Sequence, residues 1–143
     1  MSKDIILIIG ASSDIGIDLI KNIDEEALIL AHYNSSGKGL LELSNKIDNE
    51  LVIIKADLSI EDETISMIEY IENKHGIPNK IIHLAAPKFK NIRFKDIVLD
   101  DFQNDLEISL KSLMIILNKF LPKLAKEKQG KVVCMLSSVV LNI

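Results

Sequence analysis

The sequence predicts an α/β fold, in which a doubly wound parallel sheet carries helices on both faces. Short apolar runs rich in β-branched residues alternate along the chain with longer segments of helical periodicity. Nearly all residues of the short runs are apolar, which is typical of strands buried on both faces of a parallel sheet. Because crossovers between parallel strands are right-handed, this alternation distributes the helices over both sides.

The short runs define the expected strands. They are Ile5–Ile9, Ala27–Tyr33, Leu51–Lys55, Lys80–Leu84 and Lys131–Leu136. The first helix is expected to begin near Asp14 and to end near Asn22. The second and third cover about 38–47 and 60–74, and Gly76 followed by Pro78 ends the third.

The longest helix is expected from about Leu99 to Lys128, closed by Gly130. Pro122 predicts a late kink or a turn within it. Apolar residues recur along it at helical spacing. They are Leu106, Leu110, Leu113, Leu117, Phe120 and Leu124.

Composition bounds the function. The chain has 143 residues, enough for one domain over 1–143, and its net charge is -4. This charge offers no basic excess for a phosphate backbone, so nucleic acid is not an expected partner. The apolar run at 5–9 is too short for a signal peptide or a membrane span, and a cytoplasmic protein without a membrane partner is expected.

Cysteine and histidine give no metal pattern. Cys134 is the only cysteine, so it forms no internal disulfide, and we expect it to be a small buried hydrophobic residue. His32, His75 and His83 lack the spacing of a zinc site, and no metal is predicted. On its apolar strand, His83 is expected to be a packed, hydrogen-bonded core residue rather than a proton carrier.

A glycine turn follows the first strand. Gly10 permits the turn, and Gly16 lets the next helix lie close to the sheet. The helix N-terminus after the turn favours a phosphate. The two glycines are six residues apart, which fits GxxxGxG or GxxGxxG with the middle glycine replaced, and not GxGxxG. Because two glycines alone match weakly, a turn without a ligand remains an alternative at this point.

The segment Gly10–Gly16 resembles the TGxxxGxG fingerprint of short-chain dehydrogenases/reductases, with Ile9 for the usual Thr and Asp14 for the middle Gly. Four further segments follow in the family's order. They are Ala56–Ser59 at the acidic motif, His83–Ala86 at the NNAG position, Leu106–Met114 on the helix of the catalytic Asn, and Gly130–Ser138 at the strand of the catalytic Ser.

The resemblance implies a Rossmann-like sheet of strand order 3-2-1-4-5 and an oxidoreductase that moves hydride between a nicotinamide and a carbonyl or secondary alcohol. Ser138 is then catalytic, and Ser109 stands in place of the catalytic Asn, a departure that affects the family's usual proton-relay water. The implied cofactor residues are Gly10, Ser12, Ser13, Ile15 and Gly16 at the pyrophosphate, Asp57 and Leu58 at adenine, Ala85 and Ala86 along the cofactor, and Tyr33, Asn34 and Ser35 after the second strand.

The end of the second strand bears on the choice between NAD(H) and NADP(H). An NAD site usually has an acid there, but this sequence continues Asn34-Ser35-Ser36 and then Lys38. These side chains can hydrogen-bond a 2′-phosphate and add positive charge, so NADP(H) is favoured over NAD(H). A polar loop that only caps the next helix is the open alternative.

The family's catalytic YxxxK pair should follow Ser138. The one match, Tyr70 to Lys74, precedes the fourth strand, and we interpret it as a chance pair on an exposed helix. The sequence ends at Ile143, so we expect an incomplete domain, the amino-terminal part of a longer enzyme, inactive as these residues alone. The alternative is a non-catalytic nucleotide-binding or regulatory module.

The expected partners are a small carbonyl or alcohol substrate and further copies of the chain. The resemblance implies a homodimer or tetramer through the helix at 99–128. The apolar stripe of this helix can instead pack entirely on the sheet. The sequence does not distinguish packing on the sheet from contact between copies of the chain. Neither the substrate nor the direction of the reaction follows from the sequence.

Overall fold

The computed structural model describes residues 3–88 and 90–136. Their strands form one parallel sheet of order β3-β2-β1-β4-β5, so the predicted strand order is confirmed. The strands begin and end within two residues of the predicted limits. They are β1 (Asp4–Ile9), β2 (Ala27–Tyr33), β3 (Glu50–Lys55), β4 (Lys80–His83) and β5 (Lys131–Cys134).

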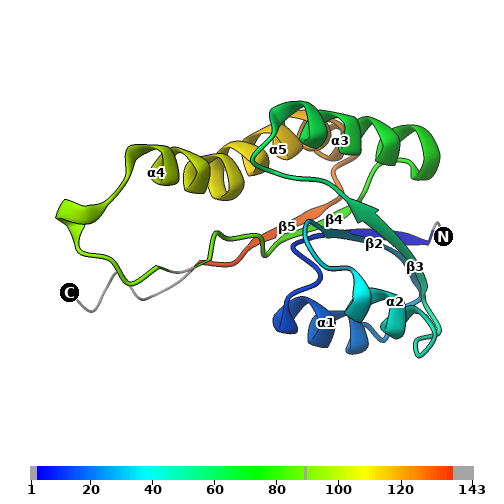
Figure 1. Ribbon diagram of the computed structural model, residues 1–143. Coiled ribbons are helices and arrows are strands. Elements are labelled where there is room, and N and C mark those ends of the chain that lie inside the picture. The colour runs from blue at the N-terminus through cyan, green and yellow to red at the C-terminus, as the bar shows by residue number, and fades with distance from the viewer. Residues whose placement is uncertain (1–2, 89, 137–143) are drawn as a thin grey trace.

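Helices cover both faces of the sheet, as Figure 1 shows. On one face lie α1 (Asp14–Lys21) and α2 (Lys38–Ser44), and on the other lie α3 (Glu61–His75) and α5 (Ser112–Glu127). A 3₁₀ turn (Phe94–Asp96), α4 (Leu99–Leu106) and a π-helical turn (Glu107–Lys111) precede α5. The predicted doubly wound architecture is therefore confirmed.

The core has two layers because successive strand residues point to opposite faces. On β1, Leu7 and Ile9 pack with Phe120 and its neighbours under α3 and α5. Ile6 and Ile8 pack under α1 and α2. All four strand side chains are buried, which explains why this strand is an unbroken apolar run.

The prediction that the last strand is buried on both faces is wrong, and so is the prediction of a buried Cys134. Lys131, Val133 and Cys134 are exposed, and only Val132 packs partly against the core. Within the part of the chain that the structure describes, β5 lies at one edge of the sheet and pairs with β4 alone. An apolar, β-branched sequence favours the strand conformation, but its side chains are buried only where other strands and helices pack against them.

The long helix forms between the predicted limits, and it contains a π-helical turn at 107–111. Such a turn adds a residue and shifts the phase of the helix. Leu110, one of the apolar residues of the stripe, lies in this turn and is 54% exposed. The residues that α5 buries follow i, i+4 spacing and are Ser112, Ile116, Phe120 and Leu124, and the helix continues through Pro122.

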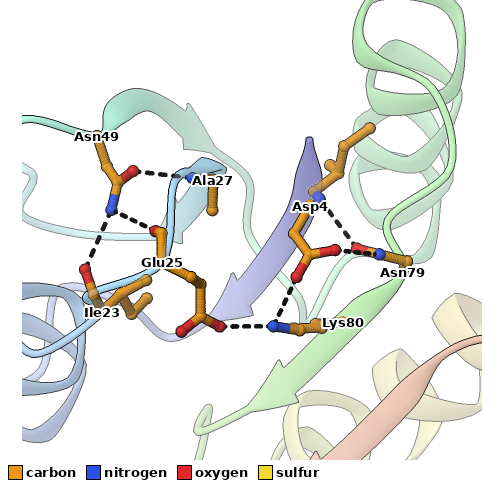
Figure 2. A network of polar contacts seen from close by, with 8 residues as sticks. Asp4, Ile23, Glu25, Ala27, Asn49, Asn79 and Lys80 are labelled. Carbon is orange, nitrogen blue, oxygen red and sulfur yellow. Dashed lines mark hydrogen bonds and ion pairs between the residues drawn. The ribbon is translucent and has the colours of Figure 1, made fainter. Parts of the chain in front are cut away.

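Polar side chains hold the amino ends of the strands, as Figure 2 shows. The Asn79 side chain accepts from the Ile5 N–H (2.9 Å) and donates to the Asp4 carboxylate (2.7 Å). Lys80 then bridges the carboxylates of Asp4 and Glu25. The amino edge of the sheet is thus occupied by structural contacts, and the carboxyl edge is where a ligand site can form.

Candidate functional site

The turn after β1 depends on two close backbone approaches. Gly10 has φ +80°, and a Cβ there would lie 2.8 Å from the Ala85 backbone nitrogen. A Cβ on Gly16 would lie 2.4 Å from the carbonyl oxygen of Ala11. Only glycine fits either position without moving the backbone, so the turn after β1 packs directly on the end of β4, and α1 packs on that turn.

Ser13 caps α1 from within the same turn. Its hydroxyl donates to the Gly10 carbonyl (2.9 Å) and accepts from the Gly16 N–H (3.1 Å). The N–H groups of Asp14 and Ile15 precede that of Gly16 and have no acceptor inside the helix. This helix N-terminus can therefore hold an anion, although the exposed Asp14 carboxylate lies in its first turn.

A cleft of about 390 Å³ opens at the carboxyl edge of the sheet, above this turn. It brings together most of the residues predicted to hold a cofactor, although they come from four separate segments. Those that line it are Gly10, Ser12, Ser13, Tyr33, Asn34, Ser35, Leu58, Ala85 and Ala86. His32, Leu84, Pro87, Lys88 and Ile108 complete the lining and were not among the predicted site residues.

Some predicted site residues do not line the cleft. Ile15 is exposed and Gly16 buried, both on α1 beside it. One Asp57 carboxylate oxygen accepts from the N–H (2.9 Å) and hydroxyl (2.6 Å) of Ser59, so this side chain folds over its own loop. Ser138 lies outside the described residues.

Ser109 lies in the π-helical turn, next to Ile108 of the cleft lining. Its hydroxyl donates to the Asp105 carbonyl at 2.6 Å and so satisfies a backbone group within the helix. The turn brings the long helix against the cleft at the place where the resemblance puts a catalytic residue. The structure does not place the Ser109 hydroxyl in the cleft lining.

His83 is buried at the end of β4, as predicted, and its Nε2 lies 3.4 Å from the Ser112 hydroxyl. That hydroxyl donates to the Ile108 carbonyl, so the histidine N–H is the donor between the two side chains. Burial lowers the pKa of His83 to about 4. The ring is therefore neutral near pH 7, and the prediction of a packed, hydrogen-bonded core residue is confirmed.

Among the lining residues that sequence reasoning missed, His32 makes hydrogen bonds to two other strand ends. Its Nδ1 lies 3.1 Å from the Gly10 nitrogen and its Nε2 lies 3.0 Å from the Ala56 oxygen. Burial lowers the pKa of this imidazole. The only signal in the sequence was a polar ring at the end of an otherwise apolar strand. It directly precedes the loop that is predicted to contact the ribose of the cofactor.

The Tyr70–Lys74 match lies on α3. The Tyr70 ring is 45% exposed, meets the His75 ring edge-on at 5.5 Å, and does not line the cleft. Among residues 3–88 and 90–136, no helix is long and apolar enough to cross a bilayer. The same residues contain no group of three or more His, Cys, Asp or Glu side chains placed to hold a metal ion.

The chain resembles curated proteins that align with it over nearly its whole length. The chain is 25% identical over 134 residues to the NADPH-dependent pterin aldehyde reductase of Arabidopsis thaliana, covering 92% of this chain and 55% of that protein. It is 17% identical over 133 residues to an uncharacterized oxidoreductase of Staphylococcus epidermidis, covering 93% of this chain and 57% of that one. The chain thus spans little more than half the length of the curated relatives it matches.

Solved structures show the same fold. A short-chain dehydrogenase/reductase from Saccharomyces cerevisiae superposes with a TM-score of 0.79 at 20% identity, over 98% of this chain and 55% of that one. The L-sorbose reductase of Gluconobacter frateurii, in complex with NADPH and L-sorbose, gives 0.80 at 16% identity, over 94% and 52%. The family model described as short chain dehydrogenase matches residues 4–142. The chain therefore belongs to the short-chain dehydrogenase family.

Proposed function

We propose that the protein binds NADP(H) in the cleft at the carboxyl edge of the sheet and moves hydride between its nicotinamide and a carbonyl or secondary alcohol. One observation carries this proposal: a single cleft joins the glycine turn, the loop after β2, Leu58 and Ala85-Ala86. In an open parallel sheet, ligands bind in such a crevice outside the carboxyl ends of the strands.

Each part of the cleft matches a part of the cofactor. The N–H groups at the start of α1 face the pyrophosphate and favour its charge. Leu58 offers an apolar wall for adenine. Asp57 does not line the cleft, so its carboxylate would turn away from Ser59 to accept from the adenine amino group. Ala85 and Ala86 leave room beside the glycine turn for the rest of the cofactor.

The preference for NADP(H) rests on the loop after β2. Asn34 and Ser35 line the cleft and are exposed, so their polar groups are available to a 2′-phosphate. Lys88 also lines this cleft and adds a positive charge to it. The names of two similar proteins, one NADPH-dependent and one complexed with NADPH, support the same preference.

Calorimetric titration with NADPH and NADH tests both parts of the proposal. We expect binding of both cofactors, with NADPH about tenfold tighter, the scale of one charge-assisted hydrogen bond. Asn34→Asp places a carboxylate beside the 2′-position and should reverse the order. Asn118→Asp, the same change on an exposed residue of α5 that does not line the cleft, is the matched control. Absence of binding for both cofactors would reject the proposal.

Hydride transfer is tested separately from binding. Ser138→Ala should cripple turnover while leaving NADPH affinity unchanged, because the hydroxyl is proposed to orient the substrate and not the cofactor. The second candidate function is a nucleotide-binding or regulatory module without turnover. Turnover that survives Ser138→Ala would reject the catalytic role of Ser138, and binding without any turnover would favour the second candidate.

We also propose that copies of the chain associate through the long helix. Leu110, Met114 and Leu121 are exposed at helical spacing along it, which supports an apolar contact face. Sedimentation velocity of the native protein should give a dimer or tetramer, and Met114→Glu should shift it towards the monomer. A native monomer at all concentrations would contradict this part of the proposal.

A further inference from the structure

Two backbone groups determine the protonation state of the His32 ring. The Gly10 nitrogen, 3.1 Å from Nδ1, can only donate, so Nδ1 must carry a lone pair. The Ala56 carbonyl, 3.0 Å from Nε2, can only accept, so Nε2 must carry the proton. The ring is therefore the neutral Nε2–H tautomer.

The ring and backbone of His32 together connect three strand ends. The ring joins Gly10, directly after β1, to Ala56, directly after β3. The His32 carbonyl also accepts from the Ala11 N–H at 2.8 Å. The side chain is 2% exposed and lies in the floor of the cleft. It sets the separation between the turn proposed for the pyrophosphate and the loop proposed for adenine.

Protonation would break this arrangement. A proton on Nδ1 would point at the Gly10 N–H, and two donors cannot share one hydrogen bond. Of the groups around the ring, Asp57 at the end of β3 favours the protonated form, whereas His83, across Ile9 on β4, repels a second positive charge. Ile54, which pairs with His32 on β3, carries no charge, and neither does Ile9, which follows the last residue of β1 that pairs with β2.

We propose that His32 is a positioning residue for nucleotide binding: its neutral Nε2–H tautomer holds the glycine turn against the end of β3, and protonation of the ring weakens binding. This inference rests on the proposed function for its ligand, and the tautomer itself is tested without any ligand. It extends the proposal by naming a residue that acts through the backbone of the glycine turn and by adding a dependence on pH.

The first arm of the test is NMR of the ¹⁵N-labelled protein. Two-bond ¹H–¹⁵N spectra should show the His32 proton on Nε2, and a scalar coupling should connect the Gly10 nitrogen to Nδ1 across the hydrogen bond. A proton on Nδ1 would overturn the proposal, whether or not any nucleotide binds. This arm needs no substitution, so it stands even where a variant fails to fold.

The second arm compares His32→Asn with His32→Leu in titrations with NADP⁺. The Asn side-chain oxygen can take the place of Nδ1, whereas Leu fills the space but leaves the Gly10 N–H without an acceptor. We expect Asn to bind within about threefold of the native protein and Leu to bind about tenfold more weakly. A role in packing alone would give the opposite order, because Leu preserves the apolar volume, and that order would overturn the proposal.

The third arm follows pH. The native affinity, relative to that of His32→Asn, should fall about tenfold per pH unit below the His32 midpoint measured by NMR. The 2′-phosphate of NADP⁺ titrates equally for both proteins, so their ratio isolates the histidine. A ratio independent of pH through that midpoint would overturn the proposal while leaving the proposed function intact. Absence of NADP⁺ binding in the native protein would reject the proposed function, and with it the role of His32 in nucleotide binding.

Discussion

At the scale of single residues, the glycine turn keeps its shape through contacts that one methyl group would break. Gly16→Ala would place a Cβ 2.4 Å from the Ala11 carbonyl oxygen and push α1 away from the turn after β1. We expect the free energy of unfolding to fall by about 2 kcal/mol, as for other overpacked sites, measured by urea denaturation.

Gly39→Ala is the matched control for this change. A Cβ on Gly39 would meet only the Ile17 side chain, at an ordinary 3.6 Å, and the residue is inside α2. Alanine is the better helix former by about 0.5–1 kcal/mol, so this variant should be as stable as the native protein or more so. An equal loss in the free energy of unfolding for Gly16→Ala and Gly39→Ala would contradict the close approach at Gly16.

Asp14 places a negative charge in the first turn of α1, where the proposed pyrophosphate would bind. Asp14→Asn removes that repulsion, so NADPH affinity should rise by about two- to fivefold, more at low salt than at high salt. The same change should lower helix stability slightly, because an acid at a helix N-terminus is favourable. Affinity that is unchanged at low ionic strength would place the phosphates away from this turn.

Local residue roles were predictable from the sequence, and distant ones were not. Gly10 and Gly16 act within one short turn, so the sequence was sufficient to predict that turn and its close packing, although not the cap that Ser13 forms there. His32 acts on backbone groups that are 22 and 24 positions away in the chain. Nothing in the sequence near His32 marks these partners, because only the pairing of the strands brings them together.

At the scale of elements, apolar runs located the five strands of the described residues, since a strand inside a parallel sheet has no polar face to obscure the pattern. Two properties were not predictable. The exposure of β5 depends on its outer position in the sheet. The phase of the long helix depends on the π-helical turn at 107–111, which apolar spacing does not encode.

The end of α5 gives a prediction at this scale. Lys128 closes the helix with φ 52° and ψ 32°, a left-handed conformation that glycine adopts at lower cost. Lys128→Gly should therefore raise the free energy of unfolding by about 0.5–1 kcal/mol in urea denaturation. Lys126→Gly, inside the helix, should lower it by about 1 kcal/mol. A loss of stability for both variants would contradict the left-handed cap.

At the scale of the whole molecule, Lys80 connects β4 to the carboxylate of Asp4 on β1 and to Glu25 before β2. Its hydrogen bonds lower the pKa of both carboxyls below their ordinary values. The stability they contribute is present above the pKa of the unfolded chain. It is lost as the pH falls through the folded pKa, below about pH 4.

Lys80→Met tests this contribution. The variant should be less stable near neutral pH, and its free energy of unfolding should fall less steeply between about pH 5 and pH 2. Lys3→Met is the control at the same edge of the sheet. Lys3 reaches Glu26 and Glu50 only at 3.8 and 3.9 Å with exposed partners, so its loss should change little. If the free energy of unfolding of the native protein and of Lys80→Met changed equally with pH, the role of Lys80 with Asp4 and Glu25 would be contradicted.

The segment from the 3₁₀ turn through α4 to the π-helical turn has no buried residue. Its amide hydrogens are therefore expected to exchange with deuterium by local opening, faster than those of β1 and β2 and without unfolding of the sheet. Ile108, at its end, also lines the cleft. Deuterium uptake at 93–111 should therefore slow when a nucleotide binds in the cleft. This measurement reports binding without requiring a known substrate.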